Sequence, residues 1–282
     1  FLRPALETSP GLLLVSTRVQ TGHLYSCLEA VMFFSRLLLH GSAVLCFGIF
    51  LICPVFARAD THPEPVVRTL EKQNEKVNIK VSWPFTGISR IDEESEGFVR
   101  GVVAEFEKEA EELAALWEQE RGKETAEIFV PRELSVTYEL TRPTQTVESI
   151  LWTVWSYMGG AHGQLSLVAH NYEVETGYPV LLEDLFLDPE RAILEFARIS
   201  RQRLGAESNP EEEAIPDDML QAGTEPVESN FQIFVLLSDG LRIHFPPYQV
   251  APWAMGPQSV DITLKELNMA KPDMKFWAPI TN

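Results

Sequence analysis

Residues 149–163, Ser-Ile-Leu-Trp-Thr-Val-Trp-Ser-Tyr-Met-Gly-Gly-Ala-His-Gly, contain the pattern that decides the fold. In residues 149–157 apolar side chains occupy both sets of alternating positions, so we expect a strand that is covered on both faces and lies inside a sheet. Gly159 and Gly160 follow it directly. Two adjacent glycines predict a turn with positive φ, or a close approach of another backbone, before the next strand.

Strand-like and helix-like segments continue on both sides of this stretch. Alternating apolar residues predict further strands at 77–84, 133–140, 165–174, 231–237, 241–245 and 259–263. An apolar residue every three or four positions predicts a helix over residues 91–121. Asp188 before Pro189 predicts the start of a second helix, which Gly205 ends. This order indicates an α+β protein, with an antiparallel or mixed sheet packed against two helices.

The N-terminal part of the chain predicts export. Residues 32–36 carry one positive charge, residues 37–56 form an uncharged apolar run, and Ala57-Arg58-Ala59 places small residues where a signal peptidase reads. We therefore expect a signal peptide over residues 32–59, with cleavage between Ala59 and Asp60 and no stable membrane anchor afterwards. An uncleaved apolar run, about long enough to span a bilayer, is the alternative.

The remaining boundaries follow from composition. We interpret residues 1–31, which precede Met32, as a misassigned or non-native upstream segment, with a cytoplasmic tail as the alternative. The other expected segments are a polar linker at 60–76, a strand-helix-strand subdomain at 77–146, a C-terminal domain at 147–270 and a tail at 271–282.

Charge and cysteine positions limit the function. The net charge of the chain is −18, and that of residues 60–282 is −20, because residues 1–59 hold four arginines and two glutamates. Such a field repels nucleic acid and attracts basic proteins. All three cysteines lie in residues 1–59. We therefore expect the exported chain to have no disulfide, no metal site and no cofactor.

Few residues are candidates for chemistry. His162 could act as a base or a ligand, but neither His170 nor His244 stands at metal-ligand spacing from it, so we favour a structural or interface role. Asp184 adjoins Glu183, and adjacent residues on a strand point apart, so Asp184 is expected to cap a turn rather than form an acid/base pair. Trp253 lies in a proline-flanked loop and is the best candidate for an exposed aromatic residue that stacks on a sugar.

Four motifs in order resemble the RsiV-like domain family. They are Tyr157-Met158-Gly159-Gly160-Ala161-His162; Asn171-Tyr172 with Thr176-Gly177 and Leu182-Glu183-Asp184-Leu185-Phe186; Leu236-Leu237-Ser238-Asp239-Gly240-Leu241; and Phe245-Pro246-Pro247-Tyr248-Gln249-Val250-Ala251-Pro252. The resemblance covers residues 147–267 and gives Gly159, Gly160, Ala161 and Asp184 as the structural motif.

The resemblance implies a periplasmic or secreted binding module of the cell envelope. One member of that family is an anti-sigma factor that binds lysozyme, and another carries the domain beside a peptidoglycan deacetylase. The expected partner is therefore lysozyme or another basic cell-wall hydrolase, with His162, Trp253 and Tyr248 as tentative binding residues. Peptidoglycan or another glycan is the alternative ligand, and a hydrolase that uses His162 with an acidic residue is the second alternative.

Overall fold

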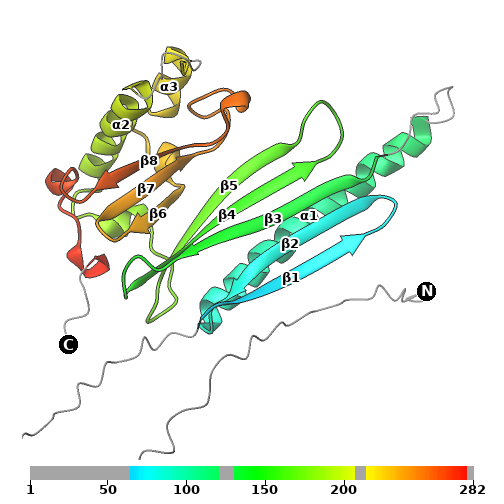
Figure 1. Cartoon of the computed structure of the whole chain (residues 1–282), viewed down its shortest axis with the longest axis horizontal. Coiled ribbons are helices and arrows are strands. Elements are labelled where there is room, and N and C mark those ends of the chain that lie inside the picture. Colours follow the sequence, from blue (N-terminus) through cyan, green and yellow to red (C-terminus); the bar gives the residue numbers. More distant parts are fainter. Residues whose placement is uncertain (1–63, 121–129, 207–213, 278–282) are drawn as a thin grey trace, which may run out of the picture. The chain divides into compact units, whose positions relative to one another are not determined.

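The computed structural model describes residues 64–120, 130–206 and 214–277, which fall in one compact unit. Two sheets form its framework (Figure 1). The first contains β1 (Val66–Gln73), β2 (Val77–Phe85), β3 (Arg132–Thr141), β4 (Val147–Tyr157) and β5 (Gln164–Glu173), in that spatial order. The second contains β6 (Phe234–Leu237), β7 (Gly240–Phe245) and β8 (Gln258–Thr263). The predicted signal peptide and its cleavage site lie outside the described residues.

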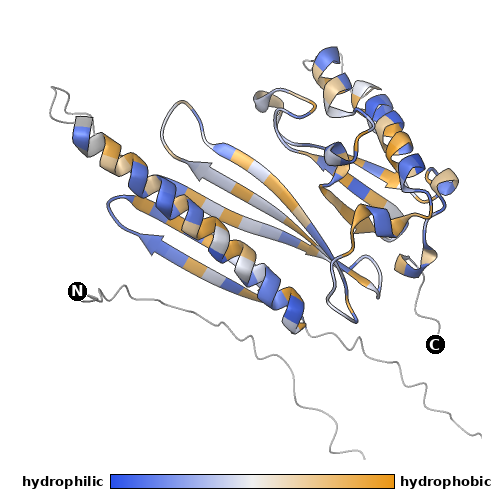
Figure 2. Cartoon of the chain, turned by 180° about the vertical axis from the view of Figure 1, so that it is seen from behind, coloured by the Kyte–Doolittle hydropathy of each residue, from blue (hydrophilic) through white to orange (hydrophobic). Residues whose placement is uncertain are grey.

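Helix α1 (Ser89–Glu120) covers one face of the first sheet, as the view from behind shows (Figure 2). It connects β2 to β3, which are parallel, whereas the other strand pairs of this sheet are antiparallel. A parallel pair needs such a crossover. The helix begins at a tight loop, where buried Asp92 accepts hydrogen bonds from the backbone of Thr86 at 2.6 Å and of Gly87 at 3.1 Å.

The first core lies between α1 and the sheet. Of the periodic apolar residues of the helix, Phe106 and Ala110 are 4% and 3% exposed, and Phe98 and Val102 pack against the same core. Trp152 of β4 is fully buried, and its indole lies 4.9 Å from the ring of Phe98. The apolar stripe of the helix is therefore used for packing.

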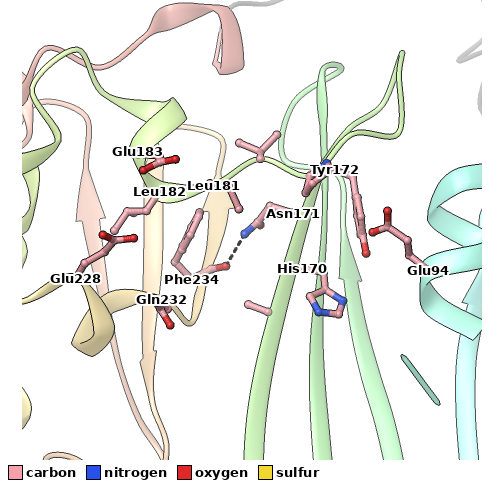
Figure 3. Close-up of a pocket in the computed structure, with 13 residues that line it drawn as sticks. Glu94, His170, Asn171, Tyr172, Leu181, Leu182, Glu183, Glu228, Gln232 and Phe234 are labelled. Atoms are coloured by element: carbon pink, nitrogen blue, oxygen red, sulfur yellow. Dashed lines mark hydrogen bonds between the residues drawn. The ribbon is translucent and has the colours of Figure 1, made fainter. Parts of the chain in front are cut away.

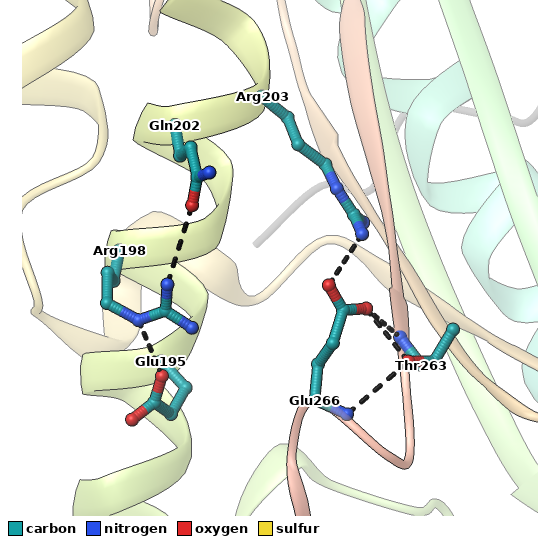
Figure 4. Close-up of polar contacts among 6 residues, drawn as sticks. All are labelled: Glu195, Arg198, Gln202, Arg203, Thr263 and Glu266. Atoms are coloured by element: carbon teal, nitrogen blue, oxygen red, sulfur yellow. Dashed lines mark hydrogen bonds and ion pairs between the residues drawn. The ribbon is translucent and has the colours of Figure 1, made fainter.

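The second sheet packs against α2 (Pro189–Ala206), and α3 (Asp217–Gly223) packs against α2 and adds Leu220 to the same core. As predicted, Asp188 caps α2 and accepts a hydrogen bond from the backbone of Arg191 at 3.1 Å. Glu266 connects α2 to the turn after β8: one carboxylate oxygen lies 2.6 Å from the guanidinium of Arg203, and the other accepts from Thr263 N and Oγ1 (Figure 4).

The two sheets meet through side chains. Asn171 of β5 donates to the carbonyl of Phe234 at 2.9 Å, and Ser149 of β4 accepts from the backbone of Leu236 at 3.3 Å. The edge of the second sheet is thus bound by polar side chains of the first, not by a continued backbone ladder. The α+β class is confirmed. The expected arrangement of one sheet packed against two helices matches only roughly, because the described residues form two sheets and three α-helices.

Two other expectations differ from the structure. The expected linker at 60–76 contains β1, an edge strand whose residues are mostly exposed and therefore lack the apolar alternation of a buried strand. The expected boundary at residue 146 falls between β3 and β4, which pair with each other inside the first sheet. Within the described residues, no helix combines the length and the apolar character needed to cross a membrane.

Candidate binding surface

The three tentative binding residues lie together. His162 lies in the β4–β5 loop, whereas Tyr248 and Trp253 lie between β7 and β8. The rings of His162 and Trp253 are stacked, with 4.9 Å between centroids and 21° between planes. Tyr248 adds a third ring, 5.9 Å from that of Trp253 at 31°. We call these three residues the aromatic stack.

The aromatic stack is accessible from solvent. His162 is exposed, Tyr248 is 56% exposed and Trp253 is half-buried. A single exposed aromatic ring is common on protein surfaces, but three in contact from two separate loops form an apolar platform. Because the rings stack on one another, a planar or ring-shaped ligand can pack on the ring faces and edges that this contact leaves free.

Glycines shape the loop that carries His162. Gly159 and Gly160 have φ of 105° and 106°, so the positive-φ alternative of the sequence analysis holds for both. Gly163 is constrained in another way, because an added Cβ there would lie 2.6 Å from the Trp155 indole. His162 Nδ1 lies 2.8 Å from the carbonyl of Gly163 and therefore carries a proton, which fixes the orientation of the ring.

Hydrogen bonds fix the segment between β7 and β8 that carries Tyr248. Tyr248 has φ of 71°, which is rare for a residue other than glycine. Its backbone N–H donates to Ala251 at 2.9 Å, and the side chain of Gln249 donates to the carbonyls of Gly223 and Asn230. A strained backbone conformation persists only where the surroundings determine it. The backbone position of Tyr248 is therefore set by the fold.

The remaining motif residues are structural. Asp184 accepts a hydrogen bond from the backbone of Leu181 at 2.9 Å, which caps the start of the 3₁₀ turn Leu182–Leu185. Ala161 is exposed beside His162. The contacts of His162 in the described part of the chain are with Trp253 and Gly163, and neither is an acid, so the geometry gives no support to the hydrolase alternative.

A cavity that the sequence did not predict lies beside the end of β5. It has a volume of about 340 Å³ (Figure 3). Its walls come from β5, α1, the segment before α2 and the segment before β6. The polar residues that line it are Glu94, His170, Asn171, Tyr172, Glu183, Glu228 and Gln232. The Asn171-Tyr172 motif drew attention to one wall of the cavity. No pattern in the sequence predicts that the segments forming the other walls lie beside it.

Two side chains on the α1 side of the cavity have perturbed pKa values. Burial, followed by the negative charge of Glu94 and a hydrogen bond to it, raises the pKa of Tyr172. Burial lowers the pKa of His170, and Glu94 partly offsets this. Trp152 Nε1 donates to His170 Nδ1 at 3.2 Å, so the proton of the neutral ring sits on Nε2.

Metal ligation has no support in the described ranges, where no cluster of three or more His, Cys, Asp or Glu residues is arranged to hold an ion.

Comparisons with known proteins agree with this architecture. Residues 183–265 match a family described as a protein of unknown function, DUF3298. A curated relative, the peptidoglycan-N-acetylmuramic acid deacetylase PdaC of Bacillus subtilis (strain 168), is 26% identical over 196 residues. That match covers 70% of this chain but 39% of the relative, so the chain spans well under half of its length.

Two solved structures share the fold. A DUF3298 family member from Bacteroides fragilis has a TM-score of 0.56 at 14% identity, covering 74% of this chain and 93% of that one. A DUF3298 family protein from Pseudomonas aeruginosa PAO1 has a TM-score of 0.53 at 14% identity, covering 76% of this chain and 97% of that one.

The fold and the exposed aromatic stack define an α+β domain with a surface suited to binding. Residues 183–265 are similar to the DUF3298 family, and solved members of that family share the fold. These matches do not single out the RsiV-like family that the sequence motifs resemble.

Proposed function

We propose that this protein is an exported binding module of the cell envelope, and that the aromatic stack binds peptidoglycan or a related glycan. The observation that carries the proposal is the contact of His162, Trp253 and Tyr248 on an accessible surface. The name of the relative in Bacillus subtilis, a peptidoglycan deacetylase, supports the cell wall as the setting.

The geometry suits a sugar ring. The C–H face of a pyranose is apolar and packs on aromatic rings, whereas its hydroxyl groups remain in water. The loops that carry the stack are fixed by Gly163 and by the Gln249 hydrogen bonds, so little conformational entropy is lost on binding. Neither the packing of a sugar on the rings nor the fixed position of the loops requires a catalytic group.

The test is binding of soluble peptidoglycan fragments by the full chain and its variants. Trp253→Ala and Tyr248→Ala should each weaken binding by about 1–2 kcal/mol, or roughly 5–30-fold, because each removes one ring of the platform. Tyr178→Ala is the matched control, since Tyr178 is 55% exposed and Tyr248 is 56% exposed. Equal effects of the Tyr178 and Tyr248 substitutions, or no effect of either stack variant, would overturn the glycan proposal.

A basic protein such as lysozyme is the second candidate ligand. The acidity of the chain favours it, and exposed glutamates at positions 105, 109, 111 and 112 place part of that charge on the outer side of α1. At physiological salt, lysozyme should bind more tightly than cytochrome c, which is also small and basic. Equal weak binding of both would indicate general electrostatic attraction.

Export has its own test. The mature N-terminus should be Asp60, because Ala57-Arg58-Ala59 forms the expected cleavage site. N-terminal sequencing of the exported protein measures this, and a mature chain that keeps residues 37–56 would contradict it.

A further inference from the structure

The cavity beside β5 has the chemistry of a binding site that is separate from the aromatic stack. Carboxylates and amides provide most of its polar lining, and neither lysine nor arginine occurs among its 13 lining residues, all of which are described. Glu183 and Glu228 are exposed. In Figure 3 both lie on the side of the second sheet, with Asn171 between them and the α1 side. The cavity therefore favours a ligand that is positively charged and supplies hydrogen-bond donors.

An unsatisfied acceptor in the wall points the same way. Asn171 is 4% exposed and donates through Nδ2 to the carbonyl of Phe234. Its Oδ1 is buried and has no hydrogen-bond partner among the described residues. A buried acceptor without a donor costs free energy. A ligand that brought a donor to Oδ1, after a small shift of the side chains that cover it, would recover that cost.

His170, the histidine in the cavity wall, does not itself supply the positive charge that the carboxylates favour. His170 Nδ1 accepts from Trp152, which requires the neutral ring. The positive charge that the carboxylates favour must therefore come from outside the wall. The cavity, of about 340 Å³, has room for part of a small organic ligand beside these carboxylates.

We propose that this cavity binds a small organic molecule through a primary ammonium group, which is held by Glu183, Glu228 and Asn171 Oδ1. The site shares no residue with the aromatic stack. A primary ammonium group has three donors, one for each of these acceptors. Both an amino sugar and an alkyl amine carry this group, so the same chemistry admits two sources.

The first experiment compares glucosamine with N-acetylglucosamine by NMR titration of the full chain. The two probes share the sugar ring, and acetylation removes the charge. Glucosamine should shift the side-chain amide resonance of Asn171 with weak, millimolar-range affinity, and N-acetylglucosamine should not. Equal shifts from both probes, or no shift from glucosamine, would overturn the proposal. A titration with 1,5-diaminopentane separates the sources: binding as tight as that of glucosamine assigns recognition to the ammonium alone, and weaker binding assigns part of it to the sugar.

Charge-neutral variants locate the site. Glu183→Gln and Glu228→Gln should each weaken glucosamine binding at least about fivefold, because each removes a carboxylate near the ammonium group. Both residues are exposed, so neither substitution disturbs the core. Glu105→Gln is the control, since Glu105 is an exposed glutamate of α1 outside the cavity, and it should change affinity by less than about twofold. An equal loss in the control would reduce the effect to net charge and refute the site.

A last variant separates this proposal from the proposed function. Trp253→Ala should leave glucosamine binding in the cavity unchanged even if it abolishes glycan binding. Loss of both activities in Trp253→Ala would show that the probe binds at the aromatic stack and would overturn the cavity assignment.

Discussion

Gly240 is the position where the second sheet tolerates a side chain least. It begins β7 and pairs with Leu237 on one side and with Thr263 on the other. A Cβ at this position would overlap the carbonyl oxygen of Ile262 and would lie 2.8 Å from Thr263 Cα. Both obstacles are backbone atoms of β8, so no side-chain rotation relieves them.

The cost of Gly240→Ala follows from what must move. Overpacking costs typically about 1–3 kcal/mol, and more where the neighbours are rigid. Trp277 Nε1 donates one shared hydrogen bond to the carbonyls of Leu237 and Gly240, both at 3.1 Å, so a shift of Gly240 also weakens this bond. A hydrogen bond contributes roughly 1 kcal/mol. We therefore expect a loss of about 2–4 kcal/mol in the free energy of unfolding.

Urea unfolding followed by circular dichroism measures this loss. Gly101→Ala is the control, because Gly101 lies in α1 and an added Cβ meets nothing within 4 Å. Alanine is the better helix former by about 1 kcal/mol, so this variant should be more stable than the parent. A Gly240→Ala variant within about 1 kcal/mol of the parent would show that β8 can withdraw freely and would refute the reasoning.

Three further predictions follow from the structure. Gly160→Ala should cost about 1–2 kcal/mol from positive φ alone, since its Cβ would meet nothing within 4 Å, and urea unfolding equal to the parent would contradict this. Burial and the charge of Arg242 lower the pKa of His244 to about 4, below its ordinary value of 6.5. The unfolded chain therefore binds the proton first, so stability should fall by about 1–2 kcal/mol as the pH drops from about 6.5 to about 4, after a discount for partial solvent screening. The same titration of His244→Gln should lack this component, and an unchanged pH profile would assign it elsewhere. Finally, the melting temperature should be the same with and without a chelator, and a drop of several degrees would reveal a metal site.

Much of the fold could be predicted from periodicity. Helix α1 runs from Ser89 to Glu120 where the pattern predicted 91–121, and the buried residues of its apolar stripe extend from Ile91 to Ala114. β1 was missed for the opposite reason, since Val66 and Val67 are 41% and 53% exposed and an edge strand needs no apolar face. The local pattern of apolar and polar residues reflects burial, so an exposed strand shows little of the alternation by which strands are predicted.

The candidate site was likewise predicted only in part from the sequence. The motifs brought His162, Trp253 and Tyr248 to attention one by one, but their contact depends on how the β4–β5 loop meets the segment between β7 and β8. The cavity beside β5 was not foreseen, because its walls come from several separate parts of the chain. Contacts between residues far apart in sequence follow from tertiary packing, which a single sequence does not encode in a readable pattern.

The exposed position of β1 also bears on self-association. A free strand edge is a template for pairing with another copy, and such pairing leads to aggregation. Here the edge strand carries Arg68 and Lys72, which form ion pairs with Glu96 and Glu107 of α1 at 3.3 Å and 2.6 Å. At the opposite edge, Pro179 forms an isolated β-bridge with Tyr172. Proline has no backbone N–H, so it cannot donate a hydrogen bond to a strand of another molecule. Charged side chains therefore disfavour pairing at the β1 edge of the first sheet, and a proline disfavours it at one end of the β5 edge. Both features oppose the growth of intermolecular fibrils.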